Sequence, residues 1–153
     1  MIFKRLIFLF LILIFNFNLS SQSLEPQKEN ITRILIIFDA SNSMYGHWQS
    51  DTKINIAKRL LNNILDSIAD IPNLQLALRV FGDQRDFPPQ DCNDTRLVVP
   101  FGEGNAKKIA HFIKYLTPRG TTPIANTLAA AANDFTPCDN CRNIIILITD
   151  GIE

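Results

Sequence analysis

Three oxygen-bearing side chains follow an apolar run at alternate positions in the segment IIFDASNSMYG. Asp39, Ser41 and Ser43 are spaced so that a curled loop can point all three toward one centre. Further along the chain, Thr122 lies in the loop TPRGTT and Asp150 follows the run IIILIT. Two carboxylates and three hydroxyls form a hard, all-oxygen donor set. Such a set suits Mg²⁺, with Mn²⁺ and Ca²⁺ as alternatives, and does not suit zinc.

The charge of this donor set indicates what it would bind. Two carboxylates only just neutralise a divalent cation, so the metal stays electrophilic and has room for an outside ligand, most naturally a carboxylate. Aspartate and serine after a strand are also ordinary turn and cap residues, because their side chains bind nearby backbone. Thr122, directly before Pro123, is likewise a candidate helix N-cap. The metal hypothesis therefore requires that the fold bring these residues together.

Apolar runs alternate with helical patterns along the chain. Strands are predicted at 32–39, 74–81, 95–101 and 142–150. The first and last are apolar enough to be buried, and the short strand 95–101 contains Pro100, which is allowed at an edge or an end. Helices are predicted within 50–70, 105–116 and 123–135, the first with Ser50 or Asp51 as its N-cap. This order predicts an α/β fold with an open, doubly wound, mostly parallel sheet covered by helices on both faces.

The strand directions predict where the oxygen donors lie. Asp39 ends the first strand, at what we term the carboxyl edge of the sheet. If the short strand 95–101 is an antiparallel edge strand, the loop that holds Thr122 returns to the carboxyl edge, and the last strand delivers Asp150 there. The segment CDNC then lies at the opposite edge. Open α/β sheets bind ligands beyond the carboxyl ends of their strands, so we expect the donors to converge.

The motifs DASNS, GTTPI and ITDG resemble the three metal loops of von Willebrand factor type A (vWA) domains, which have a Rossmann-like fold. The resemblance covers residues 32–153 and implies a metal-ion-dependent adhesion site. In that family the serines usually bind Mg²⁺ directly, the aspartates often act through water, and an acidic side chain of a partner protein completes the shell. Thr122 is preferred to Thr121 because the family's threonine directly precedes the proline. Carried over motif by motif, the metal residues are Asp39, Ser41, Ser43, Thr122 and Asp150.

The resemblance also implies six strands in the order 3-2-1-4-5-6, of which this chain supplies about four. The chain ends three residues after Asp150. We therefore expect an incomplete vWA fold, a C-terminally truncated fragment. The isoleucine-rich strand at 143–150 is then an exposed apolar edge, which promotes aggregation.

The N-terminal segment predicts export. Residues 1–23 carry two cations, an apolar run over 6–15 and a small polar patch, as in a secretory signal peptide cleaved after Ser21 or Ser23. An uncleaved membrane anchor is the alternative, although the run is about half of the roughly 20 residues that cross a bilayer. Residues 24–31 form a polar linker. We expect a periplasmic or extracellular protein with no membrane span in the mature chain.

Charge narrows the class of partner. All fifteen acidic residues but only thirteen of the fifteen basic ones follow residue 23, so the mature chain is nearly neutral. Nucleic acid and anionic membranes are bound through excess positive charge, so the partner we expect is a protein that supplies a carboxylate. A metal-assisted hydrolase using the same oxygens is the functional alternative. No general base stands out near them, and serine without a base is unreactive, so we predict no enzyme activity.

The three cysteines do not suggest redox catalysis. Cys138 and Cys141 form CDNC, which ends a predicted helix, whereas redox pairs normally open one. Export favours a structural disulfide between them. Cys92 is expected near the carboxyl edge, too far from the pair to join it unless its long loop folds down. Its partner, if it has one, is then expected beyond residue 153.

Overall fold

A computed structural model of the chain describes residues 30–151. The predicted signal peptide and all but the last two residues of the predicted linker lie outside the described residues. In the part that the structure describes, no helix has both the length and the apolar composition to cross a bilayer.

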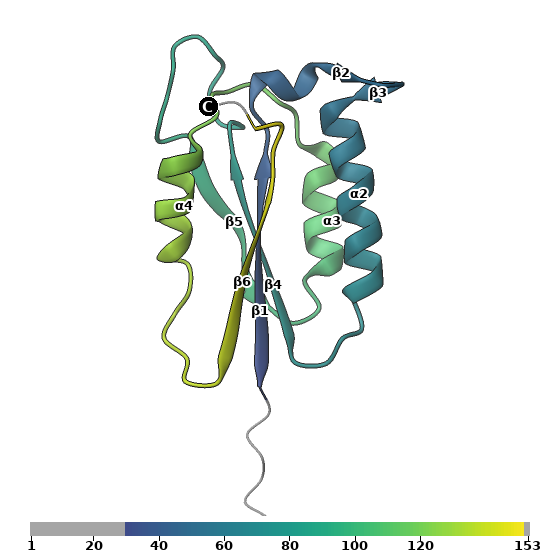
Figure 1. Cartoon of the computed structure of the whole chain (residues 1–153), viewed down its shortest axis with the longest axis vertical. Helices are drawn as coiled ribbons and strands as arrows, with labels where there is room; N and C mark the ends of the chain where they lie inside the picture. The colour runs from purple at the N-terminus through teal and green to yellow at the C-terminus, as the bar shows by residue number, and fades with distance from the viewer. Residues whose placement is uncertain (1–29, 152–153) are drawn as a thin grey trace, which may run out of the picture.

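One mixed sheet forms the centre of the fold, with its strands in the order β5-β4-β1-β6 (Figure 1). The central strand β1 (Ile31–Asp39) is parallel to β4 (Leu74–Phe81) on one side and to β6 (Cys141–Ile148) on the other. The edge strand β5 (Thr95–Gly102) is antiparallel to β4. The predicted mostly parallel α/β sheet is therefore confirmed, including its antiparallel edge.

Helices cover both faces of the sheet (Figure 1). The helices α2 (Lys53–Ile68) and α3 (Ala106–Tyr115) lie on one face, and α4 (Ile124–Ala132) lies on the other. Side chains alternate between the two faces of a strand. Accordingly, Ile36 and Phe38 of β1 join the core beneath α2 and α3, while Leu35 and Ile37 join the core beneath α4. This two-sided burial explains the continuous apolar run of β1.

The chain between β1 and α2 is not a plain loop. Residues Asn42–Tyr45 form a short 3-10 helix, η2, and a two-stranded ribbon follows, made of β2 (His47–Trp48) and β3 (Asp51–Thr52). The prediction of Ser50 or Asp51 as the N-cap of α2 is wrong, because the ribbon carries the chain on to Thr52 before the helix starts.

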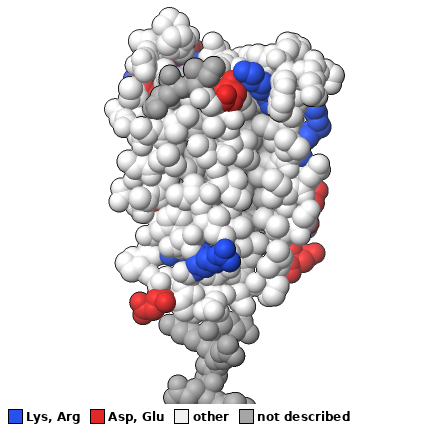
Figure 2. All heavy atoms as spheres, viewed as in Figure 1, with Lys and Arg blue, Asp and Glu red and all other residues white. Residues whose placement is uncertain are grey.

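Among the described residues, β6 pairs with β1 and has no strand on its other side. Ile145 in this strand is 41% exposed, and Leu60 and Ile64 on α2 are also exposed. Figure 2 shows that uncharged atoms cover the middle of this face of the molecule.

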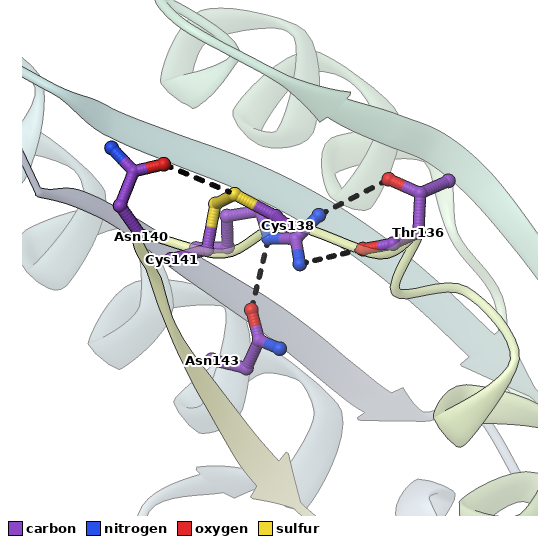
Figure 3. Close-up of a disulfide and its surroundings, with 6 residues drawn as sticks. Thr136, Cys138, Asn140, Cys141 and Asn143 are labelled. Atoms are coloured by element: carbon purple, nitrogen blue, oxygen red, sulfur yellow. Dashed lines mark hydrogen bonds between the residues drawn. A yellow bond between two sulfur atoms is a disulfide. The ribbon is translucent and has the colours of Figure 1, made fainter.

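The segment CDNC lies at the sheet edge opposite Asp39, as predicted, and holds a disulfide between Cys138 and Cys141 (Figure 3). At the same end of the sheet, the buried Arg33 donates hydrogen bonds to Asn143 Oδ1 and the Thr136 carbonyl, both at 2.9 Å. Cys92 is exposed and forms no disulfide among the described residues.

Candidate metal centre

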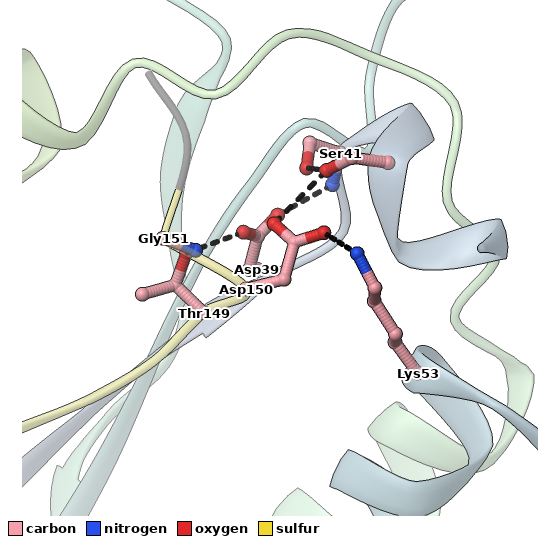
Figure 4. Close-up of polar contacts among 7 residues, drawn as sticks. Asp39, Ser41, Lys53, Thr149, Asp150 and Gly151 are labelled. Carbon is pink, nitrogen blue, oxygen red and sulfur yellow. Dashed lines mark hydrogen bonds and ion pairs between the residues drawn. The ribbon is translucent and has the colours of Figure 1, made fainter. Parts of the chain in front are cut away.

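Four of the five predicted donors form one connected hydrogen-bonded cluster at the carboxyl edge. The Ser41 and Ser43 hydroxyl oxygens are 3.0 Å apart, and the Ser43 hydroxyl donates to Asp150 Oδ1 at 3.0 Å. Asp39 Oδ1 accepts the Ser41 backbone N–H at 2.7 Å. Figure 4 shows the carboxyl groups of Asp39 and Asp150 beside Ser41. Side chains 107 positions apart in sequence therefore meet in one site.

The fifth predicted donor, Thr122, lies on a loop that is fixed to the serine loop by backbone hydrogen bonds. The Asn42 N–H donates to the Gly120 carbonyl at 2.9 Å, and the Arg119 N–H donates to the Ala40 carbonyl at 3.0 Å. Among the described residues, however, the Thr122 side chain has no hydrogen bond to the other four donors. The loop is where the sequence predicts it, and the metal role of Thr122 stays a prediction.

Hydrogen bonds distinguish the two threonines of this loop and identify the N-cap of α4. Thr121 is buried, and its hydroxyl donates to the Asp91 carbonyl at 2.7 Å, so it holds the long loop 82–94. The helix α4 has Pro123 as its N-cap and no side-chain cap hydrogen bond, so Thr122 does not cap it.

Two glycines permit the close approach of the loops. Gly82, just after β4, has φ +73°, and a Cβ there would lie 2.7 Å from the Ser41 nitrogen and the Thr121 carbonyl oxygen. At Gly120, a Cβ would lie 2.5 Å from Asp94 Oδ2. The carboxylate of Asp94 is buried and accepts backbone N–H groups of the loop 82–94. Gly82, at the end of β4, thus packs directly against both the serine loop and the loop that holds Thr122.

Asp39 is fully buried. Burial raises the pKa of its carboxyl group above the ordinary value. Hydrogen bonds from Ser41 and from the Thr149 hydroxyl, which donates to Oδ2 at 2.7 Å, oppose that rise, whereas the charge of Asp150 adds to it. An ionised Asp39 is therefore costly in the metal-free protein, and a bound cation would offset that cost.

This shift gives a pH-dependent prediction for Asp39→Asn. Because the pKa is raised in the folded state, the folded chain holds the Asp39 proton more tightly than the unfolded chain. Without a divalent cation, stability from this group is present below the ordinary pKa of 3.8 and is lost as pH rises through the folded value. Asp39→Asn does not ionise, so in EDTA we expect its stability relative to the parent to increase as pH rises from 3.8 toward neutral. Urea denaturation across that range measures the difference, and a relative loss as pH rises would contradict the account.

Two further residues of the cluster were not predicted from the sequence. Lys53, the first residue of α2, places its Nζ 2.8 Å from Asp150 Oδ2 (Figure 4). Thr149 donates to Asp39 and accepts the Gly151 N–H at 3.0 Å. Thr149 lies within the ITDG motif, so its position in the sequence could have indicated a place at the site. Nothing in the sequence distinguishes Lys53 from the other lysines on helices.

The donor chemistry fits a hard cation. Within residues 30–151, no three histidine, cysteine or acidic side chains cluster in a way that could hold a metal ion. A metal at the carboxyl edge would therefore depend on hydroxyl groups as well as on the two carboxylates. Alcohol and carboxylate oxygens are ligands for Mg²⁺, Mn²⁺ or Ca²⁺ rather than for softer metals.

Comparison with known proteins supports the fold and the motifs. The family model of the von Willebrand factor type A domain matches residues 34–153. The chain is 28% identical over 155 residues to the "Uncharacterized protein YwmD" of Bacillus subtilis (strain 168), a similarity that covers 98% of this chain and 68% of that protein.

Three solved structures share the fold. An aerotolerance-related membrane protein from Bacteroides fragilis has a TM-score of 0.60 at 22% identity, covering 76% of this chain and 52% of that one. The PilB minor pilin from Streptococcus sanguinis has a TM-score of 0.66 at 19% identity, covering 82% and 31%. The vWF domain of the type V pili tip protein Mfa5 from Porphyromonas gingivalis has a TM-score of 0.58 at 19% identity, covering 80% and 38%.

These similarities cover only part of each solved structure. The chain spans about half the length of the Bacteroides protein and less of the other two. At these identities the solved structures show a common fold. The family model, by contrast, matches well over half of the chain and includes all three oxygen-bearing motifs. The chain therefore belongs to the von Willebrand factor type A family.

Proposed function

We propose that this vWA domain is an exported binding module that holds a divalent cation, Mg²⁺ in the first instance, and docks an acidic residue of a partner protein. Asp39, Ser41, Ser43, Thr122 and Asp150 would hold the cation. The bound cation would supply an electrophilic coordination position that a carboxylate from outside can fill. The domain would then act by binding and not by catalysis.

The observation that carries this proposal is the bonded series Ser41–Ser43–Asp150 above a buried Asp39. The series joins two of the family's metal loops directly, and the third loop is tied to it through Gly120. Ser43 is exposed while Asp39 is fully buried. The cluster is therefore open to solvent on the Ser43 side and closed to solvent at Asp39. An acidic side chain of another protein could approach only from that open side.

The chain's own residues have distinct parts in such a site. Asp39 fixes the serine loop by accepting the Ser41 N–H, and Thr149 holds the other Asp39 oxygen. Asp150 holds the Ser43 hydroxyl from the neighbouring strand end. These contacts orient both serine hydroxyls before any ligand arrives, which lowers the ordering cost of binding.

The same proposal places the protein outside the cytoplasm. It is supported by the signal-peptide pattern of residues 1–23 and by similarity in fold to a minor pilin and to a pili tip protein. A disulfide at the opposite edge is consistent with an oxidising compartment.

A peptide-array experiment tests the docking proposal. The probes are aspartate- and glutamate-containing peptides, each paired with its asparagine or glutamine copy. We expect a subset of acidic peptides to be retained in Mg²⁺ and released by EDTA, and their amide copies to bind at least about tenfold more weakly, a difference of about 1.4 kcal/mol. Equal retention of both copies, or retention that EDTA leaves unchanged, would contradict docking through the metal.

A turnover assay separates binding from catalysis. With Mg²⁺ and an activated phosphate diester or carboxylic ester, we expect no hydrolysis above background. Hydrolysis that disappears in Asp39→Asn would replace the binding proposal with the hydrolase alternative.

A further inference from the structure

Lys53 occupies a position at the cluster that the metal-binding motifs do not include. Its Nζ lies 2.8 Å from Asp150 Oδ2, and the other oxygen, Oδ1, accepts the Ser43 hydroxyl. The Asp150 side chain is 7% exposed, whereas the Lys53 side chain is 32% exposed. The more buried partner is therefore the carboxylate, and the lysine approaches it from the solvent side.

The local fold directs Lys53 to this place. The β2–β3 ribbon turns the chain back after η2, and the Lys53 backbone N–H donates to the Gly46 carbonyl at 2.9 Å. The lysine side chain passes close to Gly46, since a Cβ at that glycine would lie in ordinary contact, 3.5 Å from Lys53 Cε and 3.6 Å from Nζ. The start of α2 is thus tied to the loop that carries the metal serines.

An ammonium group at this distance competes with a divalent cation for Asp150. Both need the same carboxylate, and two positive charges a few ångströms apart repel each other strongly in a partly buried site. The N-terminus of α2 adds further positive potential. Lysine has a long, flexible side chain, and its partial exposure leaves a route to solvent once another cation neutralises Asp150.

We propose that Lys53 is the resident counter-ion of Asp150, which a divalent cation must displace. In this role Lys53 keeps the buried carboxylate paired in the metal-free protein and weakens the affinity of the site for metal. The inference rests on the proposed metal site and adds a residue that sets its affinity.

The experiment compares the full chain with three variants by calorimetric titration of Mn²⁺ and by urea denaturation in EDTA. Lys53→Met removes the charge but keeps an extended side chain. Lys53→Arg keeps the charge. Lys107→Met removes the same charge from an exposed position near the start of α3, away from the carboxyl edge.

For Lys53→Met we expect stronger metal binding but lower stability without metal. Lys53→Met should bind Mn²⁺ about tenfold more tightly, about 1.4 kcal/mol, and should unfold at a lower urea concentration in EDTA. Lys53→Arg and Lys107→Met should stay within about twofold of the parent affinity. A merely structural lysine would lower stability without tightening metal binding.

The outcomes separate this inference from the proposed function. Mn²⁺ binding of equal strength in the parent and in Lys53→Met overturns the counter-ion role and leaves the metal site intact. An absence of Mn²⁺ binding in every protein overturns the metal site, and the inference with it. If Lys53→Met does not fold in EDTA, Lys53→Gln, which keeps a neutral donor toward Asp150, gives the same comparison of affinities.

Discussion

Mg²⁺ at about 100 times its dissociation constant is expected to raise the free energy of unfolding of the full chain by about 2.7 kcal/mol. The cause is linkage, because the folded chain presents the assembled donors and the unfolded chain does not. For a domain of this size, the melting temperature should rise by roughly 10 °C. Urea or thermal denaturation in Mg²⁺ and in EDTA measures the difference.

Asp39→Asn should abolish this stabilisation. The asparagine fits the same space but has no charge with which to bind the cation. The variant is thus expected to gain stability relative to the parent as pH rises toward neutral in EDTA and to gain nothing from Mg²⁺. Asp66→Asn, on an exposed turn of α2, is the matched control and should respond to Mg²⁺ as the parent does. An equal Mg²⁺ response in Asp39→Asn and the parent would show that the ion binds elsewhere.

The largest loss of stability at the site is expected from Gly82→Ala. Gly82 has φ +73°, which costs an alanine about 1–2 kcal/mol. The added methyl group would also lie 2.7 Å from the Ser41 nitrogen and the Thr121 carbonyl oxygen, so backbone on both sides must move. We expect a total loss of about 4 kcal/mol together with loss of the Mg²⁺ response, because the serine loop is pushed from its place.

Gly104→Ala provides the control for this substitution. Gly104 also has a positive φ, +66°, but a Cβ there would meet no atom within 4 Å. Its cost should be only that of the backbone conformation, about 1–2 kcal/mol, with the Mg²⁺ response kept. Urea denaturation of both variants isolates the packing contribution at Gly82. Equal losses in the two variants would mean that the close approach of the loops does not matter.

Much of the fold follows from simple patterns in the sequence. The continuous apolar run of β1 predicts a strand buried on both faces, and the structure buries Ile36 against α2 and α3 and Ile37 beneath α4. The antiparallel placement of β5 follows from chain direction, and it is the step that brings the Thr122 loop to the carboxyl edge. Convergence of the site was thus predictable once the strand directions were fixed.

The parts that could not be predicted depend on tertiary contacts. The β2–β3 ribbon has two residues in each strand, too few to give a periodic pattern, so the start of α2 at Lys53 was misplaced. The pairing of Lys53 with Asp150 joins segments 97 positions apart. The burial of Asp94 likewise depends on how the loop 82–94 folds around it, since its carboxylate accepts backbone N–H groups and the Gln84 side-chain amide of that loop.

A crystal of the full chain grown with Mn²⁺, and measured at a wavelength where manganese scatters anomalously, tests the central claim most directly. The account predicts an anomalous peak at the carboxyl edge, with the hydroxyls of Ser41 and Ser43 in its coordination shell and Thr122 turned toward it. Asp39 and Asp150 should flank the ion directly or through water, and Lys53 should have left Asp150. No peak at this edge, with Lys53 still bound to Asp150 at saturating Mn²⁺, would contradict it.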